Sequence, residues 1–186
     1  MAQITMYWIR YASRWLALGF VMLTGFLLQA QAQTPAERTA LETAILYNIL
    51  MYVEWPEEET RSAEVPFVLC VDAASQMLPS IRQLDNKSLR RMKIKVQPVD
   101  TPGLRCNAIY VDTDVSFKIA SLKVAANAYD PMLVIAGSHF SMQELSTVQL
   151  VEVDGRLAFD ISQKQSRRAG LQISSKLLRL ARKVTG

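Results

Sequence analysis

Hydrophobic and polar residues follow three different spacings along this chain, and the first spacing predicts a long helix. Thr34, Pro35 and Glu37 have the order of a helix N-terminus, with a capping residue, a proline in the first turn and a glutamate three places after the cap. The helix is expected to end at Trp55, because Pro56 disfavours helical geometry in the residue before it.

This predicted helix is apolar on more than one side. Between residues 44 and 53 only Asn48 is polar, whereas a surface helix ordinarily has one apolar stripe and a polar face opposite. The stripe expected to face the core contains Leu41, Ile45, Asn48, Ile49 and Tyr52, widened by Leu46, Leu50 and Val53. The second face is covered either by the C-terminal helix of the same chain, or by a second protomer or a partner protein. The residues predicted to bind such a partner are Tyr47, Met51, Tyr52 and Trp55.

Two other spacings predict strands. Continuous apolar runs indicate strands buried on both faces, as in a parallel sheet, and alternation indicates half-exposed strands. The predicted strands are 65–71, 92–99, 107–111 and 132–137, followed by two hairpin arms around Asp154-Gly155. Helices are predicted at 75–84 and 114–129, and a polar turn or short helix at 163–168. A last helix is predicted after Ser174 or Ser175, with Leu177, Leu178, Ala181 and Val184 inward. This order predicts a single-domain α/β sandwich, with a mostly parallel sheet, an antiparallel C-terminal hairpin at its edge and helices on both faces.

The first 32 residues have the composition of a cleavable secretory signal peptide. Two arginines precede the apolar run Trp15–Leu28, and Ala30-Gln31-Ala32 supplies small residues for cleavage. The run is shorter than the roughly 20 residues that span a bilayer, and an uncleaved N-terminal anchor is the alternative. Cleavage after Ala32 leaves one exported domain, residues 33–186, and lowers the formal net charge from +4 to +2. A chain of such small charge is not expected to bind nucleic acid.

The chain contains 2 cysteines, Cys70 and Cys106. An even pair in an exported protein usually forms a disulfide, which we expect here. A reactive thiol or a metal ligand is the alternative, but thiolate activation needs a neighbouring histidine or clustered cations, and the single histidine, His139, is distant in sequence.

The sequence lacks the patterns of enzymes and of cofactor sites. Ser138 and His139 are adjacent, yet neighbouring residues rarely face each other, and no nucleophile elbow surrounds the serine. One histidine and two separated cysteines do not supply closely spaced zinc ligands, and no glycine-rich phosphate loop follows a strand. We therefore expect no catalytic, cofactor-binding or metal-binding residues, and a protein that is not an enzyme.

Three charged stretches have structural interpretations. Glu57–Glu59 is expected to be a solvated turn, and Arg90–Lys95 an edge strand guarded by lysines, with phosphate contact as the alternative. Lys176–Val184 is a basic amphipathic segment, whose leucines are expected to dock on the sheet. The alternative for this last stretch is that it lies on a membrane surface.

Several of these segments together resemble the YfiR/HmsC-like periplasmic proteins of Gram-negative bacteria. The segments are AILYNILMYVEWP in the first helix, PFVLCV in the next strand, CNAIYV, LAFDIS and AGLQISSKLLRLA. Their order and spacing span essentially all of residues 33–186. Ser146-Thr147 stand where relatives often have a Gly-Gly pair, Ser162 replaces the usual asparagine, and the cysteines of a second disulfide found in some relatives are missing.

The resemblance implies a periplasmic regulatory protein. It would bind and repress the sensory domain of an inner-membrane diguanylate cyclase, lowering cyclic-di-GMP and the output of biofilm and exopolysaccharide. An outer-membrane OmpA-like lipoprotein is a further implied partner, and a homodimer through the first helix is a further expectation. The alternative is a periplasmic small-molecule-binding sensor serving another membrane signalling system. Its ligand would bind beyond the strand C-termini, near Asp72, Asp112 and Ser138.

Overall fold

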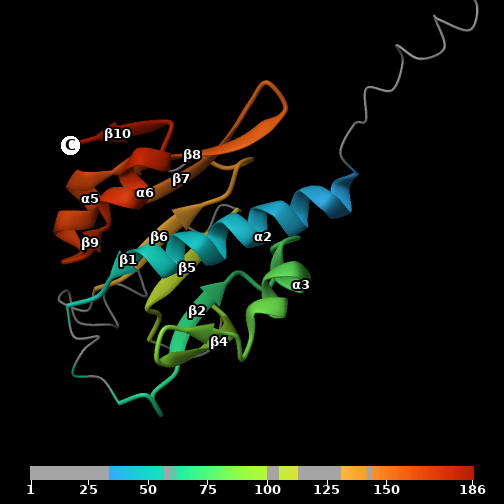
Figure 1. Ribbon diagram of the computed structural model, residues 1–186. Helices are drawn as coiled ribbons and strands as arrows, with labels where there is room; N and C mark the ends of the chain where they lie inside the picture. The colour runs from blue at the N-terminus through green and yellow to red at the C-terminus, as the bar shows by residue number, and fades with distance from the viewer. Residues whose placement is uncertain (1–33, 57–59, 61, 100–104, 113–130, 142–143) are drawn as a thin grey trace, which may run out of the picture. The chain divides into compact units, whose positions relative to one another are not determined.

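A mostly parallel sheet forms the centre of the fold (Figure 1). The computed structural model describes residues 34–56, 60, 62–99, 105–112, 131–141 and 144–186. Within them the sheet has 8 strands in the order β10-β8-β7-β6-β5-β2-β4-β3. The strands are β2 (Phe67–Val71), β3 (Ser88–Leu89), β4 (Met92–Pro98), β5 (Ala108–Val111), β6 (Leu133–Ala136), β7 (Val148–Val153), β8 (Arg156–Ser162) and β10 (Lys183–Thr185).

The pairing of these strands confirms an α/β fold and corrects the predicted edge of the sheet. Strands β4, β2, β5, β6 and β7 pair in parallel, and β7 and β8 form the antiparallel hairpin. The hairpin turns at Asp154 and Gly155, which both have positive φ, of 50° and 72°. That geometry is the one that favours an Asp-Gly pair. The hairpin does not end the sheet, however, because β10 pairs in parallel with β8 on its outer side.

Both faces of the parallel strands are buried, as the continuous apolar runs predicted. All four residues of β5 and of β6 are buried. Alternate residues belong to two hydrophobic clusters, with Tyr110 and Ile135 on the face that α2 covers and Ile109 and Val134 on the other. Cys70 and Cys106 form the expected disulfide in the second cluster, with their Cα atoms 5.8 Å apart.

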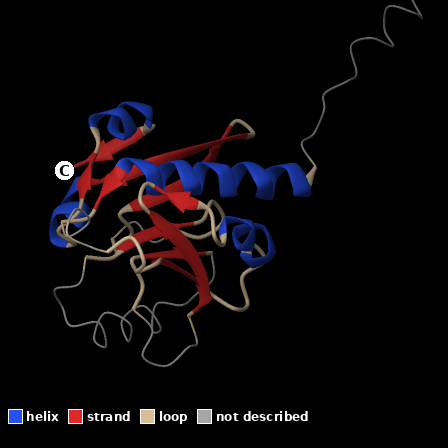
Figure 2. Cartoon of the chain, turned by 60° about the horizontal axis from the view of Figure 1, so that its bottom comes forward, coloured by secondary structure: helices blue, strands red, loops and turns tan. Residues whose placement is uncertain are grey.

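The helices of the described residues are short except for the first. They are α2 (Pro35–Tyr52), α3 (Leu78–Ile81), the 3-10 turn η1 (Arg82–Leu84), α5 (Gln163–Arg168) and α6 (Ser175–Leu180). Figures 1 and 2 show α2 lying across one face of the sheet. The prediction of helix 75–84 was too long at its start. The predicted helix 114–129, the signal peptide 1–32 and the turn Glu57–Glu59 lie outside the described residues.

Helix α2 begins where predicted but ends earlier and buries a different stripe. It stops at Tyr52, and the next two residues form β1 (Val53–Glu54), which pairs antiparallel with β9 (Gln172–Ile173). Leu41 is 39% exposed, so the stripe predicted around it was wrong at that position. The buried positions of the helix are Glu42, Thr43, Leu46, Ile49 and Leu50. The predicted stripe was also wrong at Asn48, which is exposed, and it left out Glu42, which is polar but buried.

The C-terminal segment also differs from its prediction. Ser174 caps α6 by accepting a hydrogen bond from the Leu177 N–H at 3.2 Å. The backbone becomes extended at Ala181, and the chain then runs along β8 as strand β10. Val184 was predicted to face inward on a helix, but it lies in β10 and is 41% exposed. Residues 183–185 form backbone hydrogen bonds with β8 instead of helical ones. This tertiary contact outweighs the helical preference that the sequence pattern indicated.

Candidate functional site

Polar side chains gather where three parallel strands end. Asp72 follows β2, Asp112 follows β5, and Gly137 and Ser138 follow β6. Because β2, β5 and β6 are parallel neighbours, their carboxyl ends lie at one edge of the sheet. The structure therefore places together the three residues predicted for a ligand crevice, Asp72, Asp112 and Ser138.

Glu42 joins helix α2 to this edge. Its side chain is 4% exposed, and its Oε1 accepts a hydrogen bond from the Tyr110 hydroxyl at 2.6 Å. The Ser138 N–H donates to the same oxygen at 3.3 Å, and the Ser138 hydroxyl donates to Oε2 at 3.4 Å. A buried carboxylate is tolerated only when hydrogen bonds compensate its lost hydration, and these three contacts supply them.

Asp112 lies near Tyr110 and Gly137. Its Oδ2 accepts a hydrogen bond from the Ser75 hydroxyl at 2.7 Å, whereas its buried Oδ1 has no hydrogen-bond partner. Gly137 allows the close packing here, because an added Cβ would lie 2.5 Å from the Tyr110 hydroxyl oxygen and 3.1 Å from the Asp112 Cβ. Gln149 fixes the turn after β6, since its Nε2 donates to the carbonyls of Gly137 at 3.0 Å and Phe140 at 2.8 Å.

The surroundings of Tyr110 predict a loss of stability at high pH. Burial raises the pKa of its phenol above the ordinary value of 10.0, and the Glu42 charge and hydrogen bond and the Asp112 charge raise it further. The folded state therefore keeps a proton that the unfolded chain releases above about pH 10. Below about pH 10, the protonated Tyr110 stabilises the folded state in full. Above about pH 10, the free energy of unfolding should fall by up to about 1.4 kcal/mol for each pH unit.

Denaturant unfolding of the wild type and of Tyr110→Phe at about pH 9 and about pH 11 measures this effect. The wild type should lose stability between the two pH values, and Tyr110→Phe should lose much less. Tyr47→Phe serves as a matched control, because the Tyr47 hydroxyl is exposed to solvent where it donates to the Ser88 carbonyl. Equal slopes for Tyr110→Phe and the wild type would show that another group causes the alkaline loss.

The polar side chains at these strand ends form hydrogen bonds that hold the fold together. The Ser138 hydroxyl hydrogen is directed to Glu42, and His139 is exposed. Within the described part of the chain, no group of three or more histidine, cysteine, aspartate or glutamate side chains has an arrangement that could hold a metal ion.

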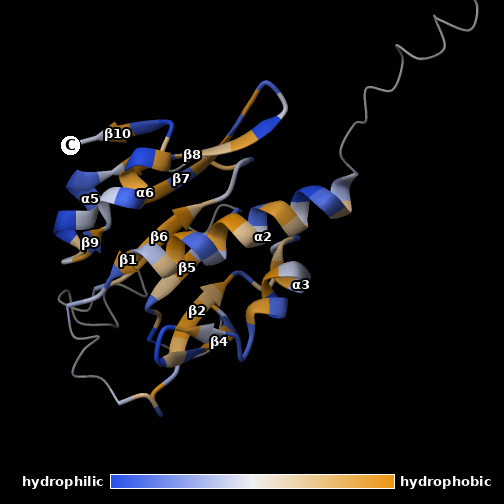
Figure 3. Ribbon diagram, in the orientation of Figure 1, coloured by the Kyte–Doolittle hydropathy of each residue, from blue (hydrophilic) through white to orange (hydrophobic). Residues whose placement is uncertain are grey.

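The outer side of α2 is the second region of interest. Tyr47, Met51 and Tyr52 are half-buried, and each packs its inner side against the main hydrophobic cluster. Lysines flank them, with the Lys87 ammonium 5.7 Å from the centre of the Tyr47 ring and the Lys176 ammonium 4.8 Å from that of Tyr52. Figure 3 shows hydrophobic and hydrophilic colours alternating along α2, and a mainly hydrophilic α5. The C-terminal segment thus reaches one flank of α2, and the middle of its outer side remains accessible.

Trp55, the fourth residue predicted to meet a partner, lies in the core. It is 7% exposed, its ring packs edge-on against Phe67 with centroids 4.8 Å apart, and its Nε1–H donates to the Asn107 carbonyl at 3.3 Å. The Arg90 guanidinium lies 5.9 Å from the centre of the Trp55 ring and donates to the carbonyls of Met51 at 2.9 Å and Val53 at 3.1 Å. Arg90 therefore satisfies the carbonyls at the C-terminus of α2, which otherwise lack helical partners.

Sequence reasoning missed Glu42, Tyr110 and Arg90. A signal was present for Glu42, because it precedes Leu46 by four residues and Ile49 by seven and so shares their side of the helix. A carboxylate on an apolar stripe indicates a buried partner. Arg90 gave no such signal, because the carbonyls that it caps are about 40 residues away in sequence.

Comparison with models of known protein families identifies the family to which this chain belongs. The family model described as YfiR/HmsC-like matches residues 39–182, from within α2 to the residue before β10. No curated protein matches the chain. Among the described residues, no helix has the length and hydropathy that crossing a bilayer requires. Because the match covers most of the sequence, the chain belongs to the YfiR/HmsC-like family, whose members are periplasmic regulators of cyclic-di-GMP cyclases.

Proposed function

We propose that this protein binds the periplasmic sensory domain of an inner-membrane diguanylate cyclase and holds the enzyme inactive. Cyclic-di-GMP, exopolysaccharide and biofilm would fall as a result. The family match over residues 39–182 carries the proposal. Residues 1–32 would act as the cleavable export signal, with cleavage after Ala32, and the Cys70–Cys106 disulfide suits an oxidising compartment.

The outer side of α2 is the surface that we assign to the cyclase. Its half-buried Tyr47, Met51 and Tyr52 have accessible apolar area at the side of the helix away from the sheet. Tyrosine and methionine are enriched at the centres of protein interfaces. Trp55 would support this surface from within rather than touch the partner, because it is buried. An OmpA-like outer-membrane lipoprotein competing for the regulator, or a second copy of this chain, would be a further partner.

Site-specific photocrosslinking in cells tests this surface. A photoreactive residue at Met51 should form an adduct with an inner-membrane protein that contains a diguanylate cyclase domain, identified by mass spectrometry. The same residue at Arg156, in the exposed turn region of the β7–β8 hairpin, is the matched control and should give at most a weak adduct. An adduct with a membrane protein of another class, or equal adducts at both positions, would contradict the assignment.

A small-molecule sensor is the second candidate, and Asp112 favours it. Its buried Oδ1 has no hydrogen-bond partner, at the strand edge where open α/β sheets bind ligands. A ligand with a donor group there would satisfy that oxygen. A thermal shift with periplasmic metabolites, lost in Asp112→Ala and kept in Asp154→Ala, would support this function.

A further inference from the structure

The charged residues of the C-terminal segment are all basic. From residue 163 to residue 186 the chain has Lys164, Arg167, Arg168, Lys176, Arg179, Arg182 and Lys183 and no aspartate or glutamate. The acidic residues all lie earlier, with Asp160 the last of them. The segment folds into α5, β9, α6 and β10, which follow one another beside β8. In space this segment has acidic neighbours on other elements, because the Gln165 Nε2 of α5 donates to the Glu144 carbonyl and Lys183 of β10 lies opposite Asp160 of β8.

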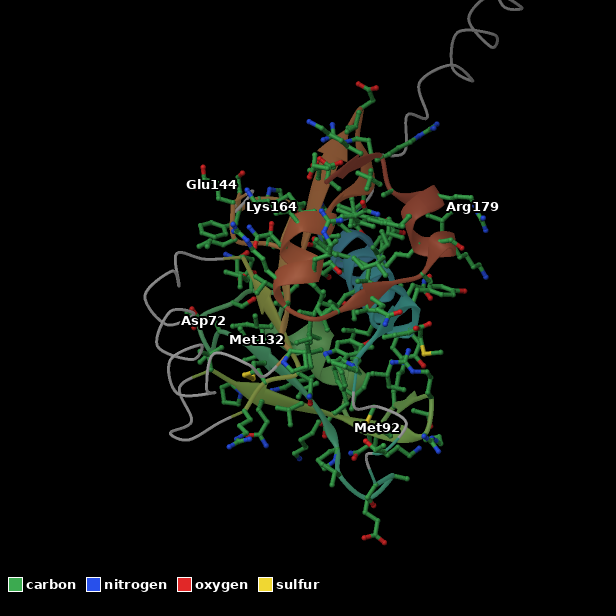
Figure 4. The ribbon with its side chains drawn as sticks, turned by 90° about the vertical axis from the view of Figure 1, so that its left-hand side faces the viewer. Asp72, Met92, Met132, Glu144, Lys164 and Arg179 are labelled. Atoms are coloured by element: carbon green, nitrogen blue, oxygen red, sulfur yellow. A yellow bond between two sulfur atoms is a disulfide. The ribbon has the colours of Figure 1, made fainter. Side chains whose placement is uncertain are left out.

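All seven of these cations are exposed, and six of them define a basic surface. Arg182 is excluded from it, because its Nε donates to Asp160 Oδ1 at 2.8 Å. The residues of the basic surface are Lys164, Arg167 and Arg168 on α5, Lys176 and Arg179 on α6, and Lys183 on β10. Figure 4 looks onto this part of the chain and places Lys164 and Arg179 at its two sides, both directed outward.

Exposed aliphatic side chains accompany the cations. Leu180, at the end of α6, is 63% exposed, and Val184 on β10 is 41% exposed, whereas Leu177 of the same helix is 2% exposed. The expectation that the leucines of this segment dock on the sheet is thus met by Leu177 and by the partly buried Leu178, which packs against the main hydrophobic cluster, and not by Leu180. Aliphatic side chains among lysines and arginines are the composition of surfaces that adsorb to the interface of anionic bilayers.

The composition of the basic surface fits a lipid better than a protein. Residues 163–186 contain no tryptophan or tyrosine, two of the three residue types enriched at the hot spots of protein interfaces, and arginine is the one of the three that is present. The aromatic residues suited to a protein partner lie on α2 instead. Cations spread over three short elements match the laterally uniform negative potential of anionic headgroups.

We propose that the basic surface binds anionic phospholipid headgroups of the membrane that carries the cyclase. This inference rests on the proposed function for its choice of membrane and deepens it. Lipid contact would hold the regulator at the bilayer while Tyr47 and Met51 of α2 remain available to the cyclase, and Lys176, 4.8 Å from the centre of the Tyr52 ring, lies where the two surfaces meet. Restriction to the membrane surface raises the effective concentration of the two proteins for each other.

Sedimentation with lipid vesicles tests the proposal on the processed protein purified from the periplasm. The protein should bind vesicles of phosphatidylglycerol and phosphatidylcholine in equal parts, should not bind pure phosphatidylcholine, and should be released by high salt. The triple variant Arg167→Glu, Arg168→Glu, Arg179→Glu should bind at least about 50-fold more weakly, because each cation at an anionic surface contributes severalfold. Leu180→Asn should weaken binding by roughly threefold or more.

A charge-matched variant separates a local surface from overall charge. Arg82→Glu, Lys93→Glu, Arg156→Glu changes three other exposed cations and should weaken vesicle binding by less than about fivefold. Unchanged circular dichroism and melting of both triple variants exclude unfolding. Equal loss in the two variants, or no preference for phosphatidylglycerol, would overturn the proposal. So would a triple variant that binds vesicles normally but no longer binds the cyclase domain in solution, which would indicate an acidic protein partner.

This outcome is independent of the cyclase, because the vesicles contain none. Failure to bind vesicles removes the lipid contact and leaves repression of the cyclase intact as a proposal. If the protein binds vesicles but its deletion leaves cyclic-di-GMP unchanged, the lipid contact stands and the proposed repression of the cyclase does not.

Discussion

Replacing Glu42 with alanine should lower the free energy of unfolding by about 3 kcal/mol. The substitution leaves the Tyr110 hydroxyl, in a side chain 1% exposed, without its acceptor, and removes the acceptor of the Ser138 N–H. A buried donor left without an acceptor costs more than an average hydrogen bond contributes. Denaturant unfolding at neutral pH measures the loss.

Two further variants identify the cause. Glu42→Gln keeps an acceptor oxygen and should lose less than half as much stability as Glu42→Ala. Glu42→Ala combined with Tyr110→Phe removes both partners, so the double variant should be more stable than the sum of the single losses predicts, by about 1 kcal/mol or more. If Glu42→Ala changes stability by less than about 0.5 kcal/mol, Glu42 does not fasten α2 to the sheet.

Removing the disulfide should lower the free energy of unfolding by more than Glu42→Ala does. Cys70 and Cys106 are separated by 36 residues, and opening a loop of that length costs about 4 kcal/mol in the chain-entropy account. Cys70 lies in β2 and is fully buried within the second hydrophobic cluster, so alanine there loses packing as well. We expect the Cys70→Ala, Cys106→Ala protein to unfold at much lower denaturant concentration.

Reduction supplies the control for this prediction. The wild type unfolded in the presence of a thiol reductant should approach the stability of the double alanine variant. The variant itself should not respond to the reductant, because it has no cysteine left. A wild type whose stability changes by less than about 1 kcal/mol on reduction would show that the crosslink is not a main source of stability.

The sequence predicted best those elements whose pattern is local. Asp154-Gly155 specified the hairpin, because both residues adopt positive φ in that turn. The continuous apolar runs at β5 and β6 predicted strands buried on both faces, and a parallel sheet provides that burial. The N-terminus of α2 was also predicted correctly, from the capping pattern around Pro35.

The sequence predicted poorly whatever depends on distant pairing. Val53–Glu54 leaves the helix to pair with β9, and Lys183–Thr185 becomes a strand because β8 offers a free side. Each element is two or three residues long, too short for a pattern of its own. In the candidate site, the predicted Asp72, Asp112 and Ser138 do lie at neighbouring strand ends. Glu42, which joins them to α2, was missed, because burial of a carboxylate depends on the partner that the fold brings to it.

Repression of a diguanylate cyclase from the periplasm is the central claim, and cellular cyclic-di-GMP tests it most directly. The concentration is measured in the parent strain, in a deletion strain, and in deletion strains that express the exported protein, a form without residues 1–32, or exported Met51→Glu. We predict that deletion raises cyclic-di-GMP and that only the exported wild type restores it. An unchanged concentration on deletion, or restoration by the form that stays in the cytosol, would contradict the claim.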